Sequence, residues 1–177
     1  HTLMTPFFDP GPNPYGNPAI FLAAVGPLMT EVAGEVADGM LCHAFSTEKY
    51  VREVTLPALR RGREKAGKDG LDGFSLTAPA MVAAGETEQQ ISEGLEAVRR
   101  QLAFYGSTPA YRPVLEVHGW GELQTELNAM TRDGAWDRMG ELITDDVIAA
   151  FAVVGTPEEV VDELQRRYGD VASRVTI

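Results

Sequence analysis

The chain has 177 residues, 44% of them hydrophobic and 23% charged, a composition typical of a folded domain rather than of a disordered segment. Its formal net charge of -11 argues against general affinity for nucleic acid, whose phosphates it would repel. No apolar run reaches the roughly 20 residues that span a bilayer, and the single cysteine, Cys42, excludes an internal disulfide. We therefore expect a cytoplasmic protein with neither membrane nor nucleic acid as a partner.

Residues 1–19 are predicted to be a connecting segment. They are rich in proline, which lacks a backbone amide hydrogen and favours extended conformations over helix. The prolines are Pro6, Pro10, Pro12, Pro14 and Pro18. Two interpretations stay open. The segment is either a flexible tail or a stretch that packs through Phe7, Phe8 and Tyr15.

Two buried strands joined by a short helix follow. Ile20–Val25 is a continuous apolar run, which is typical of a parallel strand covered on both faces. Gly26-Pro27 then turns the chain into a helix whose apolar side chains recur at i, i+4 and i+8, at Leu28, Val32 and Val36. After Asp38-Gly39 the run Met40–His43 predicts a second buried strand.

The same alternation continues through the rest of the chain. Ser46 is expected to cap a helix that runs through Arg63, and the apolar stretch 74–84 predicts a third strand. The next two helices begin at capping-box spacings, Thr87 with Gln90 and Thr156 with Glu159. The second of these helices runs through Tyr168 and leads to a last strand, Arg174–Ile177.

Residues 107–154 break this alternation and are predicted to be a helical insertion. Helical pieces are expected around Glu122–Met130, Ala135–Ile143 and Asp145–Phe151, with no strand pair among them.

Strands that alternate with helices predict parallel βαβ units with ligands at the carboxyl ends of the strands. Because the chain has no Gly-x-Gly-x-x-Gly sequence, these units favour part of a (β/α)8 barrel over a dinucleotide-binding fold. We predict an α/β fold over residues 1–177, one domain of parallel strands with helical crossovers and one helical insertion.

Two strand ends are candidate binding positions. At Gly26 a phosphate could approach the backbone and accept hydrogen bonds from the amides that open the helix, although an ordinary turn explains the sequence too. His43 ends the second strand, where an imidazole could contact substrate or simply be a satisfied strand-end residue. Ser46 is either a further contact or only a helix cap, and Cys42 is expected to be a buried structural thiol.

The loop region after the third strand carries aromatic and basic side chains that either line a pocket or pack the insertion, at Tyr105, Tyr111, Arg112, His118 and Trp120. A metal site is not expected, because His1, His43 and His118 have no ligand spacing with acidic neighbours. No nucleophile pattern is present, so the catalytic residues stay unknown.

The stretch AAVGPLMTEVAGEVADGM, residues 23–40, resembles the luciferase-like oxidoreductases, and in particular their branch dependent on the deazaflavin coenzyme F420. LPALRRGREKAG, FYGSTPAYRPVLEVHGWG and VGTPEEVVDEL extend the resemblance in the family's order. It implies the C-terminal half of a (β/α)8 TIM barrel, with strands five to eight in this chain. The missing first half would supply most ring contacts and the acid/base residues, so this chain alone is expected to be incomplete and inactive.

The resemblance also implies a function, namely hydride transfer between a small organic substrate and F420. The expected coenzyme contacts are Ala23, Ala24, Val25 and Gly26, and the expected substrate contacts are His43, Phe45 and Ser46. Two alternatives stay open, a flavin mononucleotide (FMN)-dependent luciferase-like monooxygenase and a non-catalytic half-barrel that binds a phosphate or a partner. The expected assembly is a homodimer or a pairing with the N-terminal half of the same barrel.

Overall fold

The computed structural model describes residues 11–177, so Phe7 and Phe8 of the expected connecting segment lie outside the described residues. Within the described part of that segment, residues 11–19 are exposed and adopt no helix or strand. Tyr15 is 94% exposed. Its aromatic ring therefore does not pack against the domain, as one of the two interpretations required.

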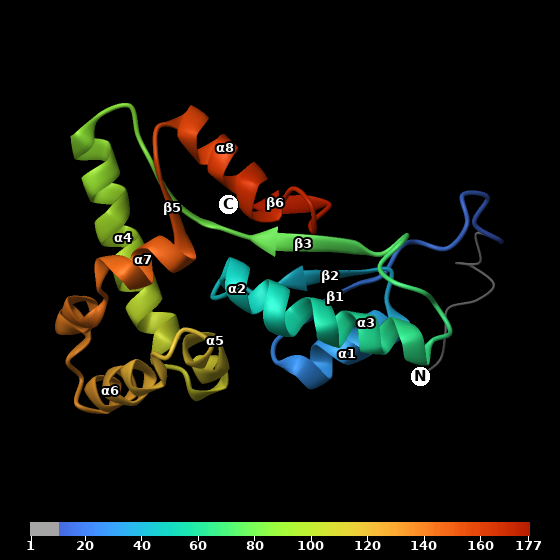
Figure 1. Cartoon of the computed structure of the whole chain (residues 1–177), viewed down its shortest axis with the longest axis horizontal. Coiled ribbons are helices and arrows are strands. Elements are labelled where there is room, and N and C mark those ends of the chain that lie inside the picture. The colour runs from blue at the N-terminus through green and yellow to red at the C-terminus, as the bar shows by residue number, and fades with distance from the viewer. Residues whose placement is uncertain (1–10) are drawn as a thin grey trace.

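Four parallel strands form the main sheet (Figure 1). β1 (Phe21–Ala24), β2 (Gly39–Cys42), β3 (Ser75–Pro79) and β6 (Arg174–Thr176) lie side by side in this order. Each neighbouring pair is parallel, so a crossover must return the chain before every new strand. The parallel α/β class expected from the sequence is confirmed. β1, β2 and β3 are neighbours in chain order, as in a barrel, whereas β6 pairs with β3 although two other strands lie between them in the sequence.

Helices make these crossovers. The connecting elements of the main sheet are α1 (Pro27–Val36), α2 (Glu48–Tyr50), the π-helical turn η1 (Val51–Thr55), α3 (Leu56–Lys65) and α8 (Pro157–Tyr168). α1 joins β1 to β2, the continuous series from α2 to α3 joins β2 to β3, and α8 precedes β6. Pro57 lies in the first turn of α3, directly after the π-helical turn.

The two faces of the main sheet differ in their surroundings. On one face Met40 and Leu76 pack with Leu59 of α3 in a core cluster. On the other face Ala23 lies beside Leu41 in the strand register, and Leu41 is 42% exposed. The helices thus cover one face only, and the open face corresponds to the inward face of a barrel.

The crossing of α1 and α3 depends on glycine. A Cβ atom on Gly62 would overlap the backbone of Glu31, and one on Gly34 would overlap the backbone of Leu59. The two helices therefore approach more closely than any larger side chain at these positions allows. Arg61 of α3 adds an ion pair to Glu31 at 3.0 Å.

A second, two-stranded parallel sheet extends from the first. Only Ala80 separates β3 from β4 (Met81–Ala84), which pairs with β5 (Ala152–Gly155). No two strands within 107–154 pair with each other, as expected, but residues 152–154 are not helical, because they belong to β5. The apolar run after Asp146 continues without a break from helix into strand, and hydrophobicity alone does not mark that boundary.

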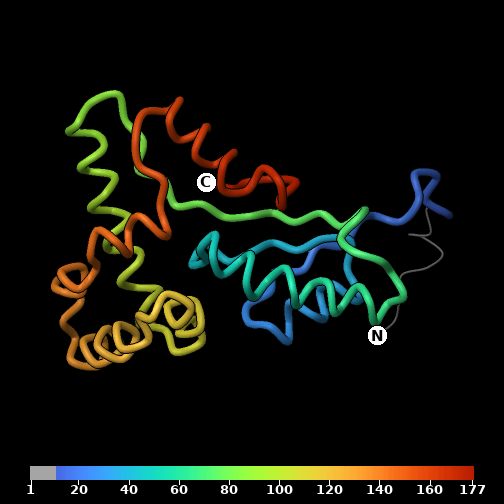
Figure 2. Tube along the Cα trace, viewed as in Figure 1, coloured from blue at the N-terminus to red at the C-terminus, as the bar shows by residue number. Residues whose placement is uncertain are grey.

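The remainder of the segment between β4 and β5 is helical (Figure 2), and it forms a separate layer beyond the carboxyl end of β3. It comprises α4 (Glu88–Gly106), η2 (Pro109–Tyr111), α5 (Arg112–Glu116), α6 (Gly121–Arg132), η3 (Trp136–Leu142) and α7 (Asp145–Phe151). Leu102, Leu115 and Leu127 lie in its own core cluster. Phe45, which follows β2, is part of this second cluster and links it to the main sheet.

Gly62→Ala is expected to lower the free energy of unfolding by about 1–3 kcal/mol, because the added methyl group forces α1 and α3 apart. Chemical denaturation of the intact protein measures the effect. Gly140→Ala is the matched control, since its Cβ would meet its nearest neighbour, in the Arg99 side chain, at an ordinary 3.7 Å. Equal midpoints for the two variants would contradict the close helix contact.

Candidate functional site

The carboxyl ends of β1 and β2 meet at one edge of the main sheet. The register pairs Ala24 with Cys42, so the turn after β1 and the loop after β2 leave the sheet side by side. Between them is a narrow cleft of about 20 Å³, lined by Ala24, Val25, Gly26, His43, Phe45 and Ser46, among others. Six of the seven residues expected from the sequence thus share one cleft, although their roles stay predictions.

Ala23 is the seventh residue, and it does not line this cleft. Its register partner is Leu41, and Leu41 pairs in turn with Thr77 of β3. Leu41 and Thr77 line a larger cleft of about 530 Å³ together with Pro79, Thr176 and Gln101 of α4. This cleft was not predicted from the sequence, because residues from five separate elements form it and no local motif marks it.

Gly26 has a conformation that other residues rarely adopt. Its φ of 77° and ψ of 160° lie in a region essentially restricted to glycine. Its carbonyl accepts hydrogen bonds from the amide and from the hydroxyl of Thr30, at 3.1 and 2.8 Å. Gly26 therefore both reverses the chain and begins α1.

The N-terminus of α1 retains its partial positive charge. No side chain caps it, and its first turn has no acidic residue. Pro27 has no amide hydrogen, whereas the amides of Leu28 and Met29 lack acceptors within the helix. These amides and the helix dipole are suited to an anionic group.

His43 contacts residues on both sides of its ring. Its Nδ1 accepts a hydrogen bond from the Phe45 amide at 3.0 Å, and its Nε2 lies 3.0 Å from the hydroxyl of Tyr111. The ring of Tyr105 meets that of His43 edge-on, with centroids 5.0 Å apart. Burial lowers the pKa of His43, which favours the neutral imidazole at neutral pH.

Phe45 and Ser46 are less accessible than expected for substrate contacts. Phe45 is 2% exposed and packs on Phe151 with ring centroids 4.4 Å apart. Ser46 is buried as well. The expected capping role of Ser46 is wrong, because the neighbouring Thr47 is the cap and its hydroxyl accepts the amide of Tyr50.

Cys42 is a protonated thiol in the sheet. Burial raises its pKa to about 12, so the nucleophilic thiolate is scarce at neutral pH. This agrees with the structural role expected from the sequence.

The loop region after α4 contacts the loop after β2 at two places, and each contact involves a histidine. Tyr111 reaches His43, and His118 lies 2.9 Å from the hydroxyl of Thr47 while its ring stacks on Trp120. Lys49 adds a hydrogen bond to the carbonyl of Val117. Burial, followed by the nearby Lys49 charge, lowers the pKa of His118.

Arg112 does not join this group. Its guanidinium pairs with Glu116 at 2.8 Å and with Glu122 at 3.4 Å. These partners hold its charge on the surface of the helical layer. Of the five loop residues considered from the sequence, the other four contact one another or the loop after β2.

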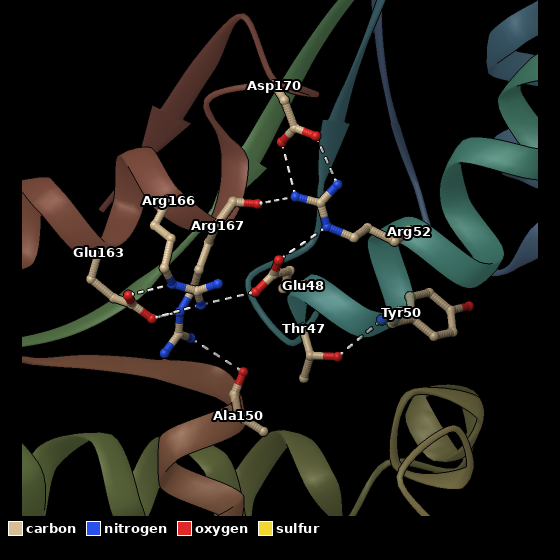
Figure 3. Close-up of polar contacts among 9 residues, drawn as sticks. All are labelled: Thr47, Glu48, Tyr50, Arg52, Ala150, Glu163, Arg166, Arg167 and Asp170. Carbon is tan, nitrogen blue, oxygen red and sulfur yellow. Dashed lines mark hydrogen bonds and ion pairs between the residues drawn. The ribbon is translucent and has the colours of Figure 1, made fainter.

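An ion-pair network holds the start of α2 against α8 (Figure 3). Arg52 bridges Glu48 and Asp170, at 3.0 and 2.9 Å, and Arg166 also reaches Glu48. On α8, Glu163 pairs with both Arg166 and Arg167. Because α2 begins two residues after Ser46, the network fixes the loop that carries His43.

Arg167 extends the same network to α7. It donates to the carbonyls of Ala149 and Ala150 at the end of that helix. Hydrogen bonds from Arg166 and Arg167 lower the pKa of Glu163 to about 2. Sequence inspection missed this network, since Arg52 and Asp170 are 118 residues apart.

Within residues 11–177, no group of three or more His, Cys, Asp and Glu side chains is placed to hold a metal ion. In the same residues, none of the helices combines the length and the apolar character needed to cross a bilayer.

Comparison with known proteins identifies the family. The sequence profile of the luciferase-like monooxygenase family matches residues 1–174. An uncharacterized protein of Mycobacterium tuberculosis (strain ATCC 25618 / H37Rv) is 47% identical over 99% of this chain and 51% of its own length. The 5,10-methylenetetrahydromethanopterin reductase of Archaeoglobus fulgidus is 31% identical over 89% of this chain and 45% of its own length.

Solved structures agree with this match. The coenzyme F420 dependent tetrahydromethanopterin reductase from Methanopyrus kandleri superposes with a TM-score of 0.72 at 28% identity, over 89% of this chain and 44% of that one. An F420-dependent secondary alcohol dehydrogenase, solved with an F420-acetone adduct, has a TM-score of 0.60 at 19% identity, over 92% and 43% of the two chains. The second likeness shows the fold alone.

The fold and the strand-end site define an α/β protein with parallel strands and helical crossovers. This chain belongs to the luciferase-like monooxygenase family, and the resemblance seen in its sequence is confirmed. The chain spans about half the length of the curated relatives it matches.

Glu163→Gln is expected to lower the free energy of unfolding by about 1 kcal/mol, because it removes the carboxylate shared by two arginines. Since folding lowers the pKa of Glu163 from 4.5 to about 2, its contribution is complete above pH 4.5 and is lost as the pH falls through 2. The difference between wild type and variant should shrink over that range. Denaturation of the intact protein at several pH values measures it.

Asp162→Asn is the matched control for this prediction. Asp162 lies next to Glu163 on α8, and within residues 11–177 it makes none of the ion pairs of the network. Two results would show that the network does not fix α8. One is a loss of stability in Asp162→Asn as large as that in Glu163→Gln, and the other is a loss in Glu163→Gln that does not change with pH.

Proposed function

We propose that this chain is part of an F420-dependent oxidoreductase that transfers a hydride between a small organic substrate and the coenzyme. The family match and the reductase relatives support the reaction class. The single observation that carries the proposal is the strand-end edge, where an uncapped helix N-terminus and an imidazole meet in one cleft. When bound, the deazaflavin ring supplies the carbon that accepts or donates the hydride.

In this proposal the first strand and its turn contact the coenzyme. The Gly26 turn leaves the backbone open, since a Cβ there would meet no atom within 4 Å, and the amides of Leu28 and Met29 are suited to an anionic group of the coenzyme. Ala23 is the small side chain on the open sheet face, beside Leu41. These features fit a ligand that combines a negative group with a flat apolar ring.

The substrate side of the proposal rests on His43, with Phe45 and Ser46 behind it. The protein's contribution would be orientation and exclusion of water around the reacting carbon. We place the acid/base residues outside this chain. The N-terminal half of the same barrel, or a second subunit, would pack on the open face of the main sheet and along the edge of β1 that no strand of residues 11–177 pairs with.

A second candidate is an FMN-dependent monooxygenase, which the family's description favours. Both coenzymes carry phosphate, so the turn at Gly26 would serve either one. Titration of the intact protein with F420 and with FMN distinguishes the two. For the cell, we propose a reducing, cytoplasmic location, since a single half-buried cysteine requires no oxidising compartment.

Leu28→Glu is expected to weaken F420 binding about tenfold, because it places a carboxylate among the amides that would hold the coenzyme's negative group. Leu28 is 79% exposed, and an acid in the first turn favours the helix itself, so the fold should tolerate the change. The dissociation constant is measured by F420 fluorescence with the intact protein.

Val36→Glu is the matched control. It makes the same change of charge at a site 65% exposed, roughly 12 Å further along the same helix. Its coenzyme affinity should change less than twofold. If both variants bind F420 as wild type does, α1 does not hold the coenzyme, and if wild type binds neither F420 nor FMN, the proposed function is wrong.

A further inference from the structure

The aromatic cluster beside the strand-end cleft holds a hydroxyl group that the proposed function has not yet used. Tyr111 comes from η2, whereas His43 follows β2, and the two rings stack with centroids 4.5 Å apart. Tyr105 and Phe45 complete the cluster, with ring centroids 6.1 and 5.7 Å from that of Tyr111. The Tyr111 hydroxyl is the polar group of this set that reaches the imidazole.

The hydrogen bonds of His43 assign its tautomer. Nδ1 accepts the amide hydrogen of Phe45, and a backbone amide can only donate. A neutral imidazole whose Nδ1 accepts must carry its hydrogen on Nε2. That hydrogen is therefore donated to the oxygen of Tyr111, which lies 3.0 Å away.

This assignment leaves the hydrogen of the Tyr111 hydroxyl available. The phenol oxygen accepts from His43, so its own hydrogen points elsewhere, and no acceptor for it is found among the side chains and carbonyls of residues 11–177. A hydroxyl that accepts one hydrogen bond is a stronger donor in the next. The available donor lies at the carboxyl edge of the sheet, on the side where barrel proteins bind substrates.

The surroundings of the hydroxyl select a neutral group as its acceptor. Within the described residues, the nearby cations are already engaged, Arg112 by Glu116 and Glu122 and Lys49 by the carbonyl of Val117. The carbonyl does not neutralise Lys49, but the charge of Lys49 acts on His118 and not on His43, the partner of Tyr111. A carboxylate would thus find no strong positive charge beside Tyr111. Phe45 and Tyr105 instead offer apolar surface next to the donor.

We propose that Tyr111 donates a hydrogen bond to the oxygen of a neutral carbonyl or alcohol substrate with an apolar body, and that His43 is a positioning residue that holds the hydroxyl. The proposal rests on the proposed function for the reaction, but it concerns substrate recognition only. The expected order of contacts is Phe45 amide, His43 ring, Tyr111 hydroxyl and substrate oxygen.

The test compares two probes of the same shape on the intact, F420-loaded protein. Acetophenone offers a carbonyl oxygen, and α-methylstyrene replaces that oxygen with a methylene group. Tyr111→Phe removes only the hydroxyl and keeps the ring in its stack, so the fold should persist. The dissociation constant for acetophenone should rise about fivefold to tenfold in this variant, whereas that for α-methylstyrene should change less than twofold.

Two substitutions at His43 separate positioning from packing. His43→Gln can still donate to Tyr111 and should bind acetophenone within about twofold of wild type, whereas His43→Leu cannot donate and should bind it several-fold more weakly. In wild type, ¹⁵N shifts of the His43 ring should show the hydrogen on Nε2. Tyr15→Phe, at a ring 94% exposed, is the unchanged control.

Three results would overturn the proposal. The first is equal acetophenone affinity in wild type and Tyr111→Phe. The second is an equal loss of affinity for acetophenone and for α-methylstyrene in Tyr111→Phe, and the third is no acetophenone binding by wild type. Each titration is repeated without coenzyme, and coenzyme affinity is measured separately in every variant. A protein that fails to bind F420 but discriminates the two probes through Tyr111 would refute the proposed function and retain the substrate contact.

Discussion

The parallel register of β1 and β2 is the constraint on which the candidate site depends. Ala24 stands opposite Cys42, so the turn at Gly26 and the loop at His43 leave the sheet at the same height and on the same edge. A shift by one residue would exchange the faces of every side chain in the strand, placing Met40 on the open face and Leu41 among the helices. The buried cluster of Met40, Leu76 and Leu59 opposes that shift, and the core thereby fixes the geometry of the cleft.

Two further interactions fix the helices and loops around the sheet. The glycine contact between α1 and α3 sets how closely the crossover helices lie, and hence where α1 begins relative to the loop after β2. The ion pairs of Arg52 and Arg166 then hold the start of α2 on α8, which belongs to a crossover more than a hundred residues later. Apolar packing alone fixes the position of one helix on another only loosely. A guanidinium that pairs with two carboxylates also fixes their relative orientation, because its hydrogen bonds are directional. The loop that carries His43 is thus held at both ends, by β2 before it and by the network after it.

Much of the fold could be predicted from the sequence because its signals are local. The positions of β1 and β2, the turn at Gly26-Pro27 and the two capping boxes beginning at Thr87 and Thr156 match the structure. The run 74–84 instead divides between β3 and β4 in two sheets, and one face of the first strands is open rather than covered. The errors occur where neighbouring residues offer the same chemistry, as with Ser46 and Thr47, or where one apolar run passes from helix into strand, as at β5. The site was predicted as two separate strand ends, and only the register places them in one cleft. His43 and Tyr111 are 68 residues apart in the sequence, and no local sequence pattern predicts their contact.

The distribution of charge bears on how so acidic a chain would hold an anionic coenzyme. With a net charge of -11, the overall field repels the ligand, so binding must come from donors that no nearby carboxylate neutralises. α4, α6, α7 and α8 each begin with acidic residues in the first turn, whereas α1 has none. Asp38, the carboxylate closest in sequence to β2, accepts the amide of Ile20 at the amino end of the sheet, the edge opposite the cleft. α3 and α5 also lack acids in the first turn, but each continues directly from a preceding helical turn, η1 or η2. The pattern therefore favours α1 as the anion-binding helix of our proposal, because acids stabilise the other four helix starts and leave this one positive.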